Sequence, residues 1–266
     1  MNGHAHGGVT VLNATATGRG CSLAVRGGVD AQWAWQDEGV IVQGAPDSRL
    51  AIACHAVAQE ILGREDGASI QTQSQMPPSR GLKTSSSAAA AMLRAAGVPE
   101  SNLELACVEA SLRAGVTLTG AFDDQVAVLR GGCHLTDNAR KRVLAQIFTQ
   151  PWHVAIWVPE RAIDKAQLMD LDATAIEPEI LAAEDRLLAD DVPAALTLNG
   201  AAFHRLYQAA GLPVDDAPTR VALEHGALGA GLSGTGPAVA ALFDRPVDLP
   251  DVPGGTWKWT QVQEAA

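Results

Sequence analysis

Hydrophobic and polar positions alternate along five early stretches of the chain, with the period of two residues that predicts half-buried β-strands. These strands are expected at 9–14, 22–25, 31–36, 40–43 and 69–75. Between the last two, apolar residues recur at helical spacing, which predicts a helix over 48–62 that Gly63 ends.

Further helices and a strand pair are predicted up to residue 150. A helix is expected over 85–96, where Gly97 and Pro99 stop it. Ser101 and Glu104 have the spacing of a capping box, which predicts a helix to about residue 113. The apolar residues 126–129, the Gly131-Gly132 pair and residues 133–136 predict a hairpin or bulged strand pair.

Helical spacing dominates the second half of the chain. After a strand at 153–158, the pattern predicts helices near 163–171, 178–188, 194–210 and 219–228, and then strands at 238–243 and 256–262. The stretch 244–255, rich in Pro, Asp and Gly, is expected to be a loop. The fold class is therefore α+β, with a strand-rich domain over 1–150 and a helix-rich domain over 151–266.

Charge and composition exclude several classes of protein. Asp and Glu total 30 against 19 Lys and Arg, for a formal charge of −11, so the chain lacks the basic stripe that nucleic acids require. It has no apolar run of the roughly 20 residues that cross a bilayer and no signal-peptide pattern at its start, so we expect no membrane segment and a cytoplasmic location. The four cysteines lie far apart without zinc-binding spacing, which favours reduced, structural thiols.

The segment 77–88 contains a glycine-containing loop, with Gly81, that leads into the N-terminus of the predicted helix. Free N–H groups and the positive end of the helix dipole at such a position suit a phosphate. The hydroxyls of Thr84, Ser85 and Ser86 could add donors and bind Mg²⁺, although a serine-rich cap on a core helix explains the residues equally well. No Gly-Lys pair occurs in the chain, so the loop is not a Walker A motif.

Two more segments carry candidate chemistry. The sequence Leu-Ser-Gly-Thr-Gly-Pro at 232–237 allows close approach of a phosphate or a backbone, although an ordinary tight turn is the alternative. Asp123 and Asp124 follow a glycine turn in 117–125 and are candidates for metal or proton chemistry, with a solvated turn as the alternative.

The order of these three segments resembles the GHMP kinase superfamily. Within it, the chain is similar to the archaeal type of shikimate kinase in the segments 13–20, 119–124, 131–138, 198–200 and 232–237. The resemblance runs from residue 10 to about residue 240. It implies a first domain like domain 2 of ribosomal protein S5, a ferredoxin-like second domain, and ATP and substrate in the cleft between them.

The resemblance also implies a reaction, in which the γ-phosphoryl of ATP moves to the 3-hydroxyl of shikimate with the help of Mg²⁺. By motif position, the triphosphate would contact Pro78, Ser79, Arg80, Gly81, Leu82, Lys83, Thr84, Ser85, Ser86, Ser87, Gly234, Thr235 and Gly236. Ser85 is the preferred Mg²⁺ ligand and Glu109 a weak second candidate. Lys83 stands where relatives usually carry a small residue.

Candidate acid–base and acceptor residues follow from the same motifs. Asp124, seven residues before Gly131, is the first choice for orienting or deprotonating the acceptor hydroxyl, and Asp123 is the second. An arginine would bind the carboxylate of shikimate well; Arg19 and Arg130 are candidates, with a surface role as the alternative for each. The remaining acceptor candidates are Asn13, Thr15 and Asp137.

Two other hypotheses remain open at this point. The acceptor of a related kinase could be homoserine, mevalonate or a sugar, because acceptor pockets are built from scattered residues. The chain could also bind nucleotide without turnover. The sequence does not determine the oligomeric state, and a homo-oligomer is one alternative.

Overall fold

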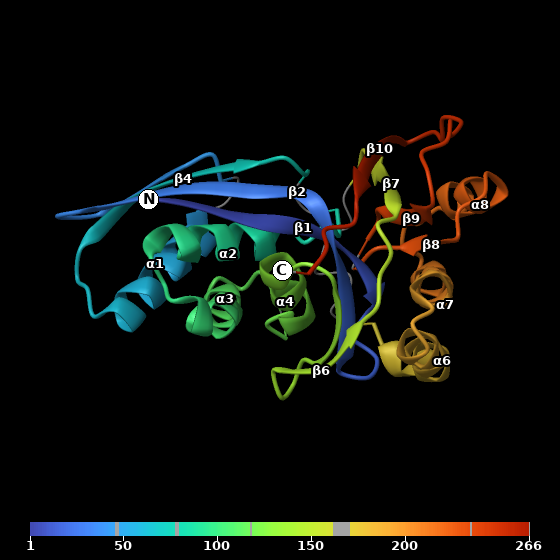
Figure 1. Cartoon of the computed structure of the whole chain (residues 1–266), viewed down its shortest axis with the longest axis horizontal. Coiled ribbons are helices and arrows are strands. Elements are labelled where there is room, and N and C mark those ends of the chain that lie inside the picture. The colour runs from blue at the N-terminus through green and yellow to red at the C-terminus, as the bar shows by residue number, and fades with distance from the viewer. Residues whose placement is uncertain (46–47, 78–79, 118, 162–170, 235, 266) are drawn as a thin grey trace.

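The computed structural model describes residues 1–45, 48–77, 80–117, 119–161, 171–234 and 236–265. Its strands form two sheets (Figure 1). The first sheet contains β1 (Asn2–Leu12), β2 (Arg19–Gln36), β3 (Val40–Gln43), β4 (Gly67–Ser74), β5 (Cys133–Asp137) and β6 (Arg142–Ile147). The second contains β7 (His153–Pro159), β8 (Gly229–Leu232), β9 (Val239–Phe243) and β10 (Gly255–Gln261).

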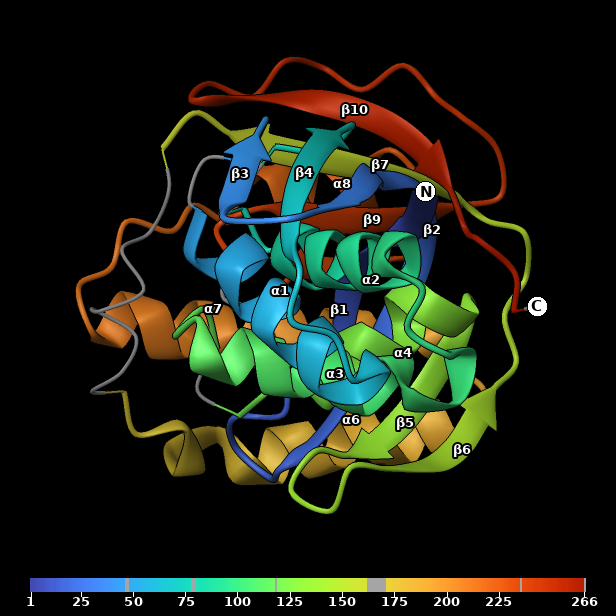
Figure 2. The same cartoon turned by 90° about the vertical axis from the view of Figure 1, so that its left-hand side faces the viewer.

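Helices cover these sheets in two groups. The first group is α1 (Ser48–Leu62), α2 (Thr84–Ala96), α3 (Glu100–Arg113) and α4 (Phe122–Arg130), which Figures 1 and 2 show gathered on one face of the first sheet. The second sheet is accompanied by η1 (Ala173–Ile176), α6 (Glu177–Leu188), α7 (Val192–Ala209) and α8 (Ala217–Glu224). None of the helices in the described ranges combines the length and apolar character needed to cross a bilayer.

Two strands predicted separately, 22–25 and 31–36, are parts of the single long strand β2. The sequence hides its continuity because the pairing of β1 with β2 shifts register between His6 and Gly7, opposite Gly28. Gly28 has φ 138°, and a Cβ there would lie 2.0 Å from the Ala5 carbonyl oxygen. The irregularity exchanges the faces of β1: Ala5 packs with the helices of the first sheet, whereas Val9 packs in the core shared with the second sheet.

The second sheet has the order β10-β7-β9-β8 and is antiparallel throughout. Numbered along the chain this order is 4-1-3-2, which is the ferredoxin-like arrangement expected for this half. The predicted loop over 244–255 is confirmed up to residue 254, and β10 begins at Gly255. β8 was not predicted, because its sequence Gly-Ala-Gly-Leu lacks β-branched and aromatic residues.

Two local predictions are wrong. Residues 126–129 belong to α4, and β5 forms its hairpin with β6 instead; four apolar residues fit a buried helix as well as a strand. The Ser101–Glu104 capping box is absent, because α3 starts at Glu100 after Pro99 and the Ser101 hydroxyl bonds to Asn102. Most of the helix predicted near 163–171 falls on 162–170, outside the described residues.

The chain passes from the first sheet to the second between Ile147 and His153, close to residue 150. Its last described residues return to the first sheet, although the sequence assigns them to the second domain. Val262 forms a β-bridge with Val25, and the Gln263 N–H donates to the Ala24 carbonyl at 3.0 Å. The C-terminal segment therefore fastens the two halves together near the middle of β2.

Candidate active site

The N-termini of α2 and α4 are joined by an ion pair between side chains that the sequence places 41 residues apart. Lys83 Nζ lies 2.7 Å from Asp124 Oδ1, and the two side chains are only 8% and 16% exposed. Lys83 also donates to the Thr10 hydroxyl on β1. An ammonium group has three N–H donors, so one is left for a further acceptor such as a phosphate oxygen.

Asp123 lies beside this ion pair and is buried. Asn138 Nδ2 donates to Asp123 Oδ1 at 2.7 Å, and the Asp123 N–H donates to Asn138 Oδ1 at 3.1 Å. The Ser22 hydroxyl lies 2.8 Å from Asp124 Oδ1 and 3.3 Å from Asp123 Oδ2. Burial and the charge of Asp124 raise the pKa of Asp123 to about 6. Asp123 is thus held in the wall of the site, while Asp124 faces Lys83.

The two glycine-containing loops found in the sequence contact each other. The Ser233 hydroxyl accepts from the Thr10 N–H at 3.0 Å and donates to the Gly81 carbonyl at 2.8 Å. Gly81 has φ 81°, and a Cβ on it would lie 2.0 Å from the Ser233 carbonyl oxygen. At Gly234, a Cβ would lie 3.3 Å from Lys83 Nζ. The loop after β8 therefore packs directly against the phosphate loop, beside the ammonium group of Lys83.

Arg80 ties the phosphate loop to the second sheet in a different way. Its guanidinium donates to the carbonyl oxygens of Pro159 and Glu160, each at 2.8 Å, and its own carbonyl accepts from the Ala238 N–H at 3.3 Å. Arg80 therefore anchors the phosphate loop to the second sheet.

Some of the hydroxyls at the start of α2 are hydrogen-bonded within the described ranges and others are not. Ser85 is exposed and Ser86 is 6% exposed, and neither hydroxyl has a hydrogen-bond partner within the described ranges. Thr84 donates to the Pro77 carbonyl at 3.2 Å, and Ser87 donates to the carbonyls of His6 and Lys83. Leu82 is buried in the core, at 2% exposure. Pro78, Ser79 and Thr235 lie outside the described residues.

These groups fit a phosphate with its magnesium ion. The first N–H groups of a helix have no partner within the helix and bind anions, and Ser85 and Ser86 add unpaired hydroxyls there. Mg²⁺ keeps several waters and takes few protein ligands when it is bound with a nucleotide. Within the described residues there is no cluster of three or more His, Cys, Asp or Glu side chains that could hold a metal alone.

Asn13 and Thr15 lie in the connection between β1 and β2, next to the second half of the chain. The Asn13 N–H donates to Asn199 Oδ1 on α7 at 2.9 Å, and Asn13 Oδ1 accepts from the Thr15 N–H at 3.0 Å. The start of β2 links this connection to Asp123, because a Cβ on Gly20 would lie 2.8 Å from the Asp123 carboxyl carbon and 3.0 Å from Ala14 Cβ. The connection that carries Asn13 and Thr15 therefore lies close to the two aspartates.

Four other predicted site residues are bound in ion pairs of their own. Arg19 pairs with Glu184, Arg130 with Glu104, Asp137 with Arg140, and Glu109 with Arg113. Gly20 and Ser22 face Asp123, so alternation turns Arg19 to the opposite face of β2, toward α6. Within the described ranges, no contact joins Glu109 or Arg130 to Lys83 or Asp124.

Sequence reasoning missed five residues that shape the site, namely Thr10, Ser22, Asn138, Asn199 and Ser233. Three of them lie inside motifs that had been noticed without a role for the residue: Asn138 in 136–138, Asn199 in 198–200 and Ser233 in 232–237. Thr10 and Ser22 are directly paired buried polar positions, and their neighbours along the two strands, Val9 and Val11 and Cys21 and Leu23, are buried and apolar. A polar residue at a buried strand position was the available signal.

A helix N-terminus that faces a lysine–aspartate pair, in a fold of this topology, defines a small-molecule phosphotransferase. The chain belongs to the GHMP kinases: the model of the GHMP kinase N-terminal domain matches residues 49–132, and that of the C-terminal domain matches 193–252. The predicted family and fold are thereby confirmed.

Relatives of known function support this assignment. The chain is 36% identical over 261 residues to a shikimate kinase of Thermococcus kodakarensis, covering 94% of both chains. It is 37% identical to one of Halobacterium salinarum, covering 89% of this chain and 86% of the relative.

Solved structures agree on the fold. A homoserine kinase from Cytophaga hutchinsonii has a TM-score of 0.74 at 19% identity, covering 99% of this chain and 96% of that one. A mevalonate kinase from L. major, solved with R-mevalonate, has a TM-score of 0.72 at 16% identity, covering 100% and 97%.

Proposed function

We propose that this protein is a shikimate kinase, which transfers the γ-phosphoryl of MgATP to the 3-hydroxyl of shikimate. The observation that carries the proposal is the 2.7 Å contact between Lys83 and Asp124, which brings a phosphate-binding helix start and a carboxylate together. The choice of acceptor draws on the archaeal relatives, which are shikimate kinases at 32–37% identity. A cytoplasmic location remains a prediction from the sequence.

On the nucleotide side, the N–H groups that open α2 and the remaining N–H of Lys83 would bind the terminal phosphates. Such preorganised donors stabilise the charge of a transferring phosphoryl group. We assign Mg²⁺ to the hydroxyls of Ser85 and Ser86, where it would neutralise phosphate charge. Gly234 and Gly236 have no side chains, so the loop after β8 would let the phosphates approach closely.

On the acceptor side, Asp124 would receive the hydrogen bond of the 3-hydroxyl. As the oxygen of that hydroxyl bonds to the γ-phosphorus, the bond from phosphorus to the bridging oxygen breaks and ADP leaves. The hydroxyl proton passes to Asp124 and then to solvent. Lys83 fixes the direction of the Asp124 carboxylate and also contacts the phosphate, so one ammonium group aligns the acceptor with the group that it attacks.

For the rest of shikimate, we propose Asn13 and Thr15 as hydrogen-bond partners of its hydroxyls. Arg19 remains a candidate for its carboxylate: the Arg19 side chain is 45% exposed, and among the described residues its guanidinium donates to Glu184 through Nη1. A guanidinium has five N–H donors, so Arg19 can bind a carboxylate without leaving Glu184. Arg130 and Asp137 would first have to give up their ion pairs.

The test is an assay of ADP release by the purified protein with ATP, Mg²⁺ and one acceptor at a time. Shikimate should give acceptor-dependent release, excess EDTA should abolish it, and phosphorus NMR should show a phosphate monoester at the 3-position. Release with homoserine, mevalonate or galactose but not with shikimate would overturn the acceptor. Nucleotide binding without any acceptor-dependent release would overturn the enzyme and favour the non-catalytic alternative.

A further inference from the structure

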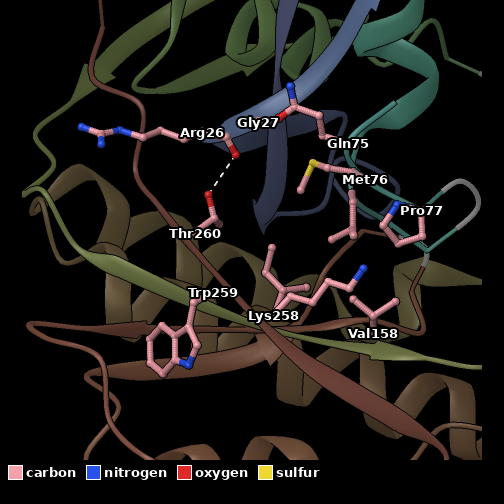
Figure 3. A pocket seen from close by; sticks show the side chains of 11 residues that line it. Arg26, Gly27, Gln75, Met76, Pro77, Val158, Lys258, Trp259 and Thr260 are labelled. Carbon is pink, nitrogen blue, oxygen red and sulfur yellow. Dashed lines mark hydrogen bonds between the residues drawn. The ribbon is translucent and has the colours of Figure 1, made fainter. Parts of the chain in front are cut away.

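A cavity of about 270 Å³ lies between the two sheets, behind the phosphate loop. Figure 3 shows Met76 and Pro77 in its wall, from the segment that leads into the phosphate loop. Leu82 of that loop also lines the cavity. Ile156 and Val158 of β7 and Lys258 and Thr260 of β10 form the opposite side. Both halves of the chain therefore contribute to the cavity, and none of the catalytic groups described above opens into it.

The cavity and the Lys83–Asp124 pair lie on opposite faces of β1 and β2. Thr10 and Ser22, which contact Lys83 and Asp124, share the face of the sheet that carries the helices. Leu82 and Val9 belong to the core cluster on the other face, where a Cβ on Gly7 would also meet the Met76 sulfur. The consecutive residues Leu82 and Lys83 thus point in opposite directions, Leu82 to the cavity and Lys83 to Asp124. An occupant that presses on Leu82 acts on the backbone that carries Lys83.

The chemistry of the walls specifies the occupant. Met76, Leu82, Ile156 and Val158 provide an apolar lining. Lys258 stands directly opposite Ile156 in the β7–β10 register, so its stem lies on the same apolar face. In Figure 3 its side chain extends toward Pro77 and Val158, whereas Arg26 extends away from the cavity.

The ammonium group of Lys258 has no ion-pair or hydrogen-bond partner within the described ranges. In a chain with 30 acidic residues, an unpaired cation at the edge of an apolar cavity is complementary to an anion from outside. Thr260 does not compete for that anion, because its hydroxyl donates to the Arg26 carbonyl at 2.9 Å. The cavity volume of about 270 Å³ lies just below the usual range of roughly 300–1,000 Å³ for ligand pockets, which limits the occupant to one ring with a short chain.

We propose that this cavity is a second ligand site, which binds a small carboxylic acid with an aromatic or alicyclic body and is coupled to nucleotide binding through Leu82 and Lys83. The ring lies against Leu82, Ile156 and Val158, and the carboxylate pairs with Lys258. The coupling rests on the proposed function, since it requires a nucleotide on the phosphate loop. Because coupling is reciprocal, it can be measured from either ligand.

The binding half is tested by calorimetry with 3-phenylpropionate as the probe and its uncharged amide as the comparison. The carboxylate should bind at least about tenfold more tightly than the amide, as a charge-assisted contact implies. Lys258→Met should remove that advantage, and Val158→Trp should abolish binding by filling the cavity. Lys141→Met, at an exposed lysine away from the cavity, should leave binding unchanged. Equal binding of acid and amide, or binding that survives both cavity variants, would overturn the site.

The coupling half compares the Kd of 3-phenylpropionate with and without saturating MgADP. A change of about threefold or more, absent in Lys258→Met, is expected; an unchanged Kd would overturn the coupling. Titration of MgADP alone separates this result from the proposed function. If MgADP does not bind at all, the kinase proposal fails, while Lys258-dependent binding of the acid would still establish the cavity as a site.

Discussion

Lys83 Nζ and Asp124 Oδ1 lie 2.7 Å apart, although Lys83 is the N-cap residue of α2 and Asp124 belongs to the first turn of α4. The location suits Asp124, because a carboxylate is stabilised at the positive end of the α4 dipole. It is unfavourable for Lys83, whose ammonium shares the sign of the α2 N-terminus and whose backbone is left-handed, with φ 60°. A residue that breaks two local preferences at once is expected where function requires it.

Asp124→Asn should reduce kcat with shikimate by at least about a hundredfold, the usual contribution of a positioned general base. The amide keeps the shape of the side chain but cannot accept the hydroxyl proton. Stopped-flow or coupled assays measure the effect, and titration with MgADP should show unchanged nucleotide binding. Asp66→Asn, at an exposed aspartate paired with Arg64, is the control. Turnover within about threefold of the wild type would show that proton transfer to Asp124 does not matter.

Gly81→Ala should abolish detectable MgADP binding. The added Cβ would lie 2.0 Å from the Ser233 carbonyl oxygen, so the phosphate loop and the loop after β8 would have to separate. Gly63→Ala is the matched control: Gly63 also has positive φ, at 63°, but a Cβ there meets no atom within 4 Å. Its cost should be confined to about 1 kcal/mol of backbone strain. Similar nucleotide affinity in the two variants would contradict the contact between the loops.

Ser233→Ala should lower the free energy of unfolding by about 1–3 kcal/mol, because it leaves the buried Thr10 N–H and Gly81 carbonyl without their shared partner. Denaturant titration measures this loss. Ser101→Ala, at an exposed serine, should change stability by less than about 0.5 kcal/mol. An equally small change in Ser233→Ala would mean that the hydroxyl does not join β1 to the phosphate loop.

Asp123 should make stability depend on pH with an unusual sign. Its native pKa of about 6 lies above the ordinary 3.8, so the native state holds a proton between these values that the unfolded state has released. The contribution of Asp123 to stability therefore rises as the pH falls from 7 through 6 toward 4.

Denaturation of the wild type and of Asp123→Asn at pH 7 and pH 4.5 checks this sign. The stability of the wild type relative to the variant should increase by about 1–3 kcal/mol on acidification. Comparing the two proteins cancels the contributions of the other titrating groups. A difference that stays constant, or that shrinks at low pH, would show that Asp123 is ionised throughout.

Long periodic elements were predictable from the sequence. The helix expected at 48–62 is α1 with the same bounds, since its apolar positions keep one period and glycine ends it. Residues 126–129 show the limit: their apolar run is too short to reveal a period, and their helical state depends on burial beneath β2. The single strand β2 was hidden for a related reason, because an irregular pairing shifts its alternation at Gly28.

The same distinction applies to the site, where local motifs were predictable and contacts between distant segments were not. Motifs located the phosphate loop, the two aspartates and the loop after β8, because each has a local signature. They did not reveal that Lys83 contacts Asp124, which depends on how two helices pack against one strand pair. Nor did they reveal that Arg19 points toward Glu184, since the face of β2 that it occupies is set by register. Ion pairs across distant segments are properties of the tertiary structure.

The most direct test of the central claim is a double-mutant cycle on kcat with shikimate, using Lys83→Met, Asp124→Asn and the double variant. If the ammonium and the carboxylate act as one unit in phosphoryl transfer, the double variant should be no slower than the slower single variant, because the second substitution removes nothing further. If the two losses multiply instead, Lys83 and Asp124 contribute independently and the paired site is contradicted.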